Sequence, residues 1–213
     1  MIICYNPRFI FIRIPKTASS SIIETFNKMN IYTDTVKLAG QKDSHSTYAE
    51  IKNHLKGMIH SYFLFTFIRN PYDRIASLYL WSVWKNREKD NEYQIFRNIE
   101  PIKKSYSEFL DYYQEKYKYR LNQINFILDK YGNNTLSFIG RFKNLECDFN
   151  ELCKKINIQT IGTMCHINKS YQPIKMYDDK NIAKIQKICK PDIKYFKFQL
   201  GDSVYVRNNY TGN

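Results

Sequence analysis

The sequence predicts an α/β fold of three layers, in which helices flank a short central parallel sheet. Two apolar runs support this class, one over residues 9–14, broken only by Arg13, and one over residues 63–68. A strand covered on both faces has this pattern, because neither face meets water. Each run is followed by a stretch with the apolar spacing of a helix, and strands and helices continue to alternate along the chain.

The junction between the first strand and its helix predicts an anion site. Pro15 ends the strand, because proline has no N–H group for the sheet. The hydroxyl residues that can cap the following helix are Thr17, Ser19, Ser20 and Ser21. A helix that begins directly after a buried strand points its free N–H groups toward the carboxyl end of that strand, and Lys16 adds an ammonium group there. This combination suits a phosphate or a sulfate.

A second strand–turn–helix unit follows at residues 63–84. Arg69 lies at the carboxyl end of the strand, Asn70 can cap the next helix, and Pro71 occupies the first helical position, where proline is favoured. Arg69 and Ser77 can face the same ligand, one from the turn and one from the helix. Two such units, each with a cation at its turn, fit one ligand that carries two separated anionic groups.

The first loop differs from the common nucleotide-binding loop. That loop has the pattern G-x-x-x-x-G-K-[ST], whereas no glycine precedes Gly40 in this chain and only Lys16 and Thr17 match. A serine-rich helix cap without a ligand is the alternative interpretation.

Two motifs resemble those of sulfotransferases that use 3′-phosphoadenosine 5′-phosphosulfate (PAPS). RIPKTASSSI (13–22) resembles their 5′-phosphosulfate loop, and IRNPYDRIASLY (68–79) resembles their 3′-phosphate motif. The segments 43–55, 139–158 and 166–179 are similar to the branch that contains heparan and chondroitin sulfotransferases and small bacterial relatives. The resemblance implies a P-loop-like fold and transfer of a sulfuryl group from PAPS to an acceptor hydroxyl. It also implies adenosine 3′,5′-bisphosphate as the product and no need for a metal ion.

The resemblance also implies roles for individual residues. Lys16 and the backbone N–H groups of the loop would neutralise the leaving phosphate, and Arg69 with Ser77 would hold the 3′-phosphate. Lys169 and Ser170 resemble a late loop near the nucleotide, although a solvated turn is the alternative. The expected nucleotide-binding residues are Lys16, Thr17, Ala18, Ser19, Ser20, Ser21, Arg69, Ser77, Lys169 and Ser170. Arg141 follows a strand and could approach the nucleotide or the acceptor, and its role is left open.

His45 is the candidate general base. Thr47 and Glu50 form a capping-box pattern, which predicts a helix over residues 48–55 with His45 just before it. The positive end of a helix disfavours an imidazolium, and a neutral ring suits a base. The family has a catalytic histidine in a similar segment. A surface histidine without a role is the alternative, and the other candidates for the base are His54, His60 and His166.

The composition indicates a single globular domain over residues 1–213, with a net charge of +13 from 33 basic and 20 acidic residues. Such a charge attracts anions in general, and codon bias in an AT-rich genome would also raise the lysine content. Five cysteines without a C-x-x-C pair predict reduced thiols in a cytosol-like compartment, with one bridge left open. We expect a soluble cytoplasmic protein, because no signal peptide and no apolar run of ~18 residues is present.

Three functions compete at this point. The first is a PAPS-dependent sulfotransferase whose acceptor is a carbohydrate or another anionic molecule with a free hydroxyl. The second is a nucleotide kinase with a degenerate loop, which the absent glycines and the lack of an acidic pair for Mg²⁺ disfavour. The third is a basic, aromatic-rich protein that binds RNA or single-stranded DNA, for which no signature occurs. The oligomeric state is left open.

The rest of the chain supplies less distinctive elements. A strand is expected within the first fourteen residues, and a short one near Ile31 and Val36. The charged segment 85–104 is expected to be a loop or a helix extension. The remaining expected helices cover 106–118, 122–131, 145–156 and 179–189, and the remaining expected strands cover 136–140, 196–200 and 204–207.

Overall fold

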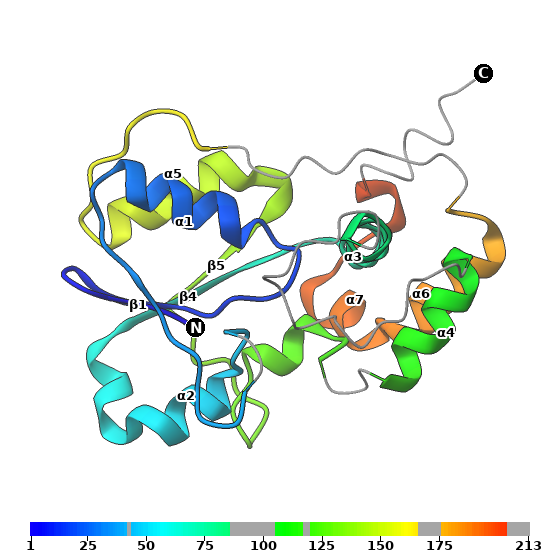
Figure 1. The fold of residues 1–213 in the computed structure, drawn as a ribbon, viewed down its shortest axis with the longest axis horizontal. Helices are drawn as coiled ribbons and strands as arrows, with labels where there is room; N and C mark the ends of the chain where they lie inside the picture. Colours follow the sequence, from blue (N-terminus) through cyan, green and yellow to red (C-terminus); the bar gives the residue numbers. More distant parts are fainter. Residues whose placement is uncertain (42–43, 86–104, 117–119, 166–175, 204–213) are drawn as a thin grey trace. The chain divides into compact units, whose positions relative to one another are not determined.

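A computed structural model describes residues 1–41, 44–85, 105–116, 120–165 and 176–203 (Figure 1). The chain divides into two compact units. The first unit contains Met1–Arg69 and Asn125–Lys169, and the second contains Asn70–Ile124 and Ser170–Asn213. The single-domain organisation stays a prediction.

The first unit is built on a five-stranded sheet with the order β3-β1-β2-β4-β5. The strands are β1 (Ile2–Tyr5), β2 (Arg8–Phe11), β3 (Asp34–Thr35), β4 (Phe63–Ile68) and β5 (Phe138–Arg141). β2, β4 and β5 are parallel to one another, whereas β1 runs antiparallel to both β2 and β3. The α/β class with a central parallel sheet is therefore confirmed, and an antiparallel hairpin extends one edge of it.

Helices cover both faces of this sheet, which gives three layers (Figure 1). One face carries α1 (Ser19–Lys28) and α5 (Leu145–Lys155), and the other carries α2 (Tyr48–Leu55) with the 3₁₀ helix η1 (Lys56–Ser61). Under α1 and α5 the core consists largely of phenylalanine. Phe11 stacks on Phe65 with ring centroids 4.9 Å apart, and Phe26 of α1 packs on Phe149 of α5 at 5.1 Å.

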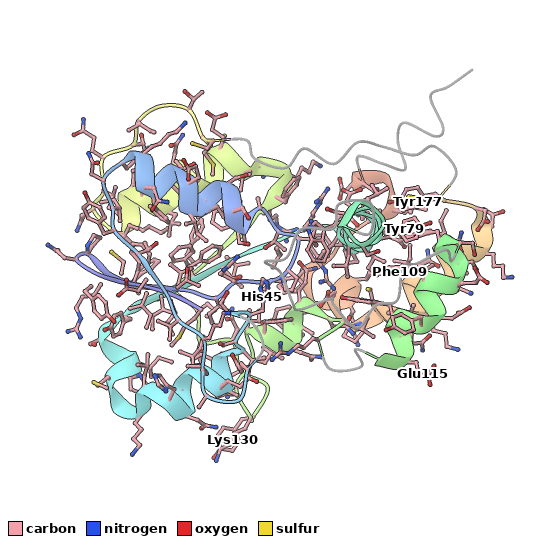
Figure 2. The ribbon with its side chains drawn as sticks, viewed as in Figure 1. His45, Tyr79, Phe109, Glu115, Lys130 and Tyr177 are labelled. Carbon is pink, nitrogen blue, oxygen red and sulfur yellow. The ribbon has the colours of Figure 1, made fainter. Side chains whose placement is uncertain are left out.

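The second unit is helical. It contains α3 (Pro71–Lys85), α4 (Tyr106–Lys116), α6 (Asp179–Ile188), α7 (Lys190–Phe196) and the 3₁₀ helix η5 (Leu200–Asp202). Aromatic rings contribute much of its core: Tyr79 of α3 lies 5.3 Å from Phe109 of α4, centroid to centroid (Figure 2). Pro71 begins α3 as expected, and the side-chain oxygen of Asn70 accepts a hydrogen bond from the N–H of Tyr72 at 3.2 Å.

Several expected elements agree with the structure. The helix expected over 48–55 and the strand expected over 63–68 have the same bounds as α2 and β4. The expected helix over 145–156 corresponds to α5, and the strand over 136–140 to β5, each within two residues at either end. No disulfide joins the five cysteines, all of which lie in the described part of the chain. The expectations for 86–104 and 204–207 concern residues outside the described part.

Three expectations about the bounds or number of helices and strands were wrong. The stretch 122–131 forms only the 3₁₀ helix η3 (Gln123–Phe126). After it the Asp129 carboxylate accepts hydrogen bonds from the N–H groups of Tyr131 and Asn133, and such local bonds compete with a helix. No strand covers 196–200, because α7 continues to Phe196, Lys197 has a left-handed backbone and a 3₁₀ helix begins at Leu200. The first fourteen residues contain two strands instead of one, since the chain turns between β1 and β2.

Candidate functional site

The loop between β2 and α1 has an unusual backbone. Lys16 has a φ of 68° and Ala18 a φ of 72°, so two residues with a Cβ occupy the left-handed region. Glycine is the usual residue for such conformations, and each instance at another residue costs about 1–3 kcal/mol. Turns of this kind aim successive backbone N–H groups into a concavity that suits an anion. The loop therefore adopts left-handed backbone conformations of the kind found in anion-binding turns, although it contains no glycine.

The hydroxyl groups of this loop do not cap α1. Its N-cap residue is Ala18, which has no capping side chain, so the expectation that Thr17 or one of the serines caps the helix was wrong. The Thr17 hydroxyl is fully buried and donates a hydrogen bond to the Ile14 carbonyl at 2.9 Å, which stabilises the turn from inside. Ser19 and Ser21 are buried and Ser20 is exposed.

Two cations meet beside this loop. Arg69, at the carboxyl end of β4, is only 8% exposed, and its Nη1 donates a hydrogen bond to the Lys16 carbonyl at 3.4 Å. Burial, and secondly the charge of Arg69, lower the pKa of Lys16 to about 8. Since a buried site with two positive groups disfavours the charged form of lysine, an anion bound there would restore that charged form. The electrostatics of this part of the first unit thus fit a phosphate or sulfate ligand.

Arg69 also has an aromatic neighbour. Its Cζ lies 4.0 Å from the centroid of the Phe142 ring, well within the distance of a cation–π contact. Phe142 directly follows β5, and Arg69 directly follows the adjacent parallel strand β4. The two residues therefore lie at the same edge of the sheet. Phe142 was not among the site residues predicted from the sequence. The glycine inside the preceding strand, Gly140, is the signal that could have found this close approach, because glycine in a strand often marks one.

His45 is hydrogen-bonded to the segment between β2 and the Lys16 loop (Figure 2). Its Nδ1 lies 3.0 Å from the Arg13 carbonyl oxygen, so the hydrogen bond requires a proton on Nδ1. In the neutral ring this leaves Nε2 as the acceptor. Arg13 in turn donates from Nη1 to the Ser44 hydroxyl at 2.7 Å. The main chain at Arg13, two residues after the end of β2, therefore fixes both the tautomer and the place of the ring.

The capping box next to His45 is formed as expected. The Thr47 N–H donates to the Glu50 carboxylate at 2.6 Å, and the Thr47 hydroxyl accepts from the Glu50 N–H at 3.3 Å. α2 therefore begins three residues after His45. His54 and His60 are exposed and follow at the other end of α2 and in η1, and His166 lies outside the described residues.

The structure thus gathers part of the expected set in the first unit. Lys16, the loop over 17–21 and Arg69 lie together, and His45 joins them through Arg13. Ser77 is buried within α3 of the second unit. Lys169 and Ser170 lie outside the described residues. Arg141 is exposed, and its backbone N–H donates to the Asp148 carboxylate at 2.6 Å.

Two kinds of feature are absent from the described residues. No helix among them is both long and apolar enough to span a membrane. None of their histidine, cysteine, aspartate and glutamate side chains form a group of three or more that could hold a metal ion.

The fold is that of an α/β protein whose candidate anion loop lies at the carboxyl end of a parallel strand. The model of the sulfotransferase family matches residues 1–199, and the chain belongs to this family. The protein is accordingly an enzyme that uses PAPS as its sulfuryl donor. No curated protein and no solved structure matches the chain. Family membership supports the sulfotransferase interpretation over a nucleotide kinase or a nucleic-acid-binding protein.

Proposed function

We propose that the enzyme transfers the sulfuryl group of PAPS to a hydroxyl group of a carbohydrate, with adenosine 3′,5′-bisphosphate as the second product. PAPS supplies an activated sulfuryl group when it is bound. The observation that carries the proposal is the pair of cations, Lys16 and Arg69, beside a loop whose backbone is held in the left-handed region. A lysine whose pKa is lowered to about 8 favours a ligand that brings negative charge.

Lys16 and the backbone N–H groups of residues 17–21 bind the 5′ end of the donor in this proposal. Negative charge grows on the oxygen of the leaving phosphate as sulfur is transferred, and fixed donors stabilise it most in that state. The fully buried Thr17 hydroxyl supports this role indirectly, because it fixes the turn without using the N–H groups. By analogy with the loss of one oxyanion donor, removal of Lys16 lowers turnover ~10²-fold or more.

Arg69 binds the 3′-phosphate. A guanidinium group presents two parallel N–H donors to a phosphate, which a lysine cannot do. The sequence motif that contains Arg69 also contains Ser77, and we assign Ser77 to the same phosphate on the sequence pattern alone. Lys169 and Ser170 keep their expected place near the nucleotide on the same kind of argument.

His45 accepts the proton of the acceptor hydroxyl. The hydrogen bond from Nδ1 to the Arg13 carbonyl supports this role, because it leaves Nε2 of the neutral ring able to take a proton. A base of this kind contributes about 10²–10⁴-fold to a reaction rate. The net charge of +13 supports an anionic carbohydrate as the acceptor, since such a field draws in acidic substrates.

Two measurements test the proposal. Adenosine 3′,5′-bisphosphate should raise the melting temperature more than AMP or ATP does, because only a ligand of the folded state stabilises it. Arg69→Ala should remove that preference while the far-UV circular dichroism spectrum stays unchanged. Incubation with sulfur-labelled PAPS and panels of glycans, lipids and peptides then identifies the acceptor. Equal shifts for the three nucleotides would contradict the donor site, and labelling of lipids or peptides alone would contradict the carbohydrate.

A further inference from the structure

Phe142 lies where two parallel strands end together. In the pairing of β4 with β5, Ile68 is opposite Arg141, so the next residue of each strand, Arg69 and Phe142, also lie side by side. Arg69 is almost completely buried, and Phe142 is half-buried at the start of the 3₁₀ helix Phe142–Asn144. The contact between them therefore follows from the register of β4 with β5.

Gly140 allows β5 to approach β4 this closely. A Cβ atom built on Gly140 would lie only 2.3 Å from the nearest atom of the Phe67 ring, a distance that real Cβ atoms do not reach. Phe67 is fully buried against Phe11 and Phe138, so its ring has little room to move. A side chain at position 140 would push the strands apart just before the point where Phe142 meets Arg69.

The guanidinium of Arg69 is restrained on two sides. Its Cζ lies over the Phe142 ring, 4.0 Å from the ring centroid, and its Nη1 donates a hydrogen bond to the Lys16 carbonyl. A free arginine side chain has many rotamers, and two-point recognition of a phosphate needs one orientation of its plane. A side chain that is held in this orientation before the ligand arrives loses less entropy on binding.

We propose that Phe142 is a positioning residue, whose ring holds the Arg69 guanidinium in the orientation that recognises the 3′-phosphate of the donor nucleotide. This inference rests on the proposed role of Arg69. It assigns to the position after β5 a part in donor specificity, and it requires an aromatic ring there and not merely an apolar side chain. A phenylalanine that only fills space would be replaced by leucine without any effect on which nucleotide is preferred.

The test is the ratio of the dissociation constants for AMP and adenosine 3′,5′-bisphosphate, measured by isothermal titration calorimetry. Phe142→Leu should lower this preference for the 3′-phosphate about threefold to tenfold, the range of a partly buried cation–π contact, and leave the affinity for AMP unchanged. Phe142→Tyr and Phe142→Trp keep a ring and should keep the preference. Circular dichroism spectra and melting temperatures of the unliganded variants report whether each one is folded.

A second set of variants, built on Arg69→Lys, separates the positioning role of Phe142 from the binding role of Arg69. Arg69→Lys keeps the charge but loses the planar group, so adding Phe142→Leu to it should cause no further loss of preference. A Phe142→Leu variant that keeps the wild-type preference, or that loses affinity for both nucleotides equally, would overturn the positioning role. A failure of the tyrosine and tryptophan variants to keep the preference would also overturn it. A wild-type protein that itself shows no preference would overturn the proposed role of Arg69, and the inference with it.

Discussion

Nη1 of Arg69 lies 3.4 Å from the backbone carbonyl oxygen of Lys16, so one cation of the candidate site is bonded to the main chain of the other. The contact brings the guanidinium close to the ammonium group, and burial together with this charge lowers the pKa of Lys16 from 10.5 to about 8. At a pH between these two values, folding therefore releases a proton from Lys16. The free energy of unfolding should accordingly rise with pH across this window as far as Lys16 is concerned.

The first prediction concerns the pH dependence of donor binding. The affinity for adenosine 3′,5′-bisphosphate should fall as the pH rises through about 8, because Lys16 then loses the charge that binds the phosphate. Above that pH the ligand should bind together with a proton. Calorimetry between pH 7 and pH 10, in buffers with different ionisation enthalpies, measures both the affinity and the proton uptake.

Lys16→Arg is the matched control for this prediction. Arginine stays charged throughout the measured range, so its affinity should not change through pH 8. A wild-type affinity that stays constant up to pH 10, with no proton uptake, would show that Lys16 does not bind the ligand through its charge.

The second prediction concerns His45. His45→Asn places an amide N–H where the Nδ1–H of the histidine donates to the Arg13 carbonyl, but it has no nitrogen in the position of Nε2. Its affinity for adenosine 3′,5′-bisphosphate should match that of the wild type, while turnover with a working acceptor falls about 10²–10⁴-fold. His45→Ala, which loses both nitrogens, should have the same low turnover.

The pH–rate profile completes this test. The wild-type rate should rise with pH as the base loses its proton, and both variants should lack that limb. A His45→Asn enzyme with near-normal turnover would move the base to another residue, and a loss of nucleotide affinity as large as that of Lys16→Ala would make His45 a ligand of the donor.

Local signals in the sequence were enough to predict the bounds of β4 and α2, the two elements next to Arg69 and His45. The bounds of β4 follow from one apolar run, and those of α2 from the capping box of Thr47 and Glu50. Both signals lie within a few neighbouring residues, where the physical cause is local. The position of His45 before α2 and of Arg69 after β4 followed directly from these bounds.

The features that the sequence did not predict depend on distant parts of the chain. Ala18 is the cap of α1 in a left-handed conformation, although four nearby hydroxyl residues favour capping by a side chain. Burial in the folded unit outweighs the local preference there, since Thr17 is fully buried and its hydroxyl donates to the Ile14 carbonyl instead of capping the helix. The contact between Arg69 and Phe142 joins segments far apart in the sequence, and only the pairing of β4 with β5 reveals it.

The third prediction concerns Gly140. Gly140→Ala should lower the free energy of unfolding by about 1–3 kcal/mol, the usual range for adding atoms to a filled core. The added methyl group would meet the Phe67 ring at 2.3 Å, and that ring is itself fully buried. Urea denaturation of the unliganded protein measures the change.

Gly57→Ala is the control in the same unit. Nothing lies within 4 Å of a Cβ built on Gly57, so this change should be neutral or slightly stabilising. Equal unfolding free energies for Gly140→Ala and the wild type would mean that β5 can move away from β4 at little cost.

The fourth prediction concerns the buried carboxylate of Asp192 in the second unit. One oxygen accepts hydrogen bonds from the backbone N–H of Gln123 at 2.8 Å and from its side chain at 3.1 Å, and the other accepts from the N–H of Ile124 at 2.9 Å. Asp192→Asn turns one of these oxygens into an NH₂ group, which cannot accept. It also removes the negative charge near the fully buried Arg74. We expect a loss of about 2–4 kcal/mol of unfolding free energy at pH 7, because a buried donor and a buried charge lose their compensation.

The contribution of Asp192 to the free energy of unfolding should also depend on pH. Burial raises the pKa of Asp192, and the charge of Arg74 and the hydrogen bonds lower it only in part. Because the pKa in the folded protein is raised, folding takes up a proton just above the ordinary range of a carboxyl group, and this residue's contribution to stability falls as the pH rises through that window. Asp192→Asn lacks the titration, so the difference in unfolding free energy between variant and wild type should change across that window and stay constant at higher pH.

Asp111→Asn is the control, since its exposed ion pair with Lys184 predicts a loss of unfolding free energy under about 1 kcal/mol. Urea denaturation from pH 4 to pH 8 measures all three proteins, and equal losses for the two variants would mean that the Asp192 carboxylate carries no more stability than a surface charge.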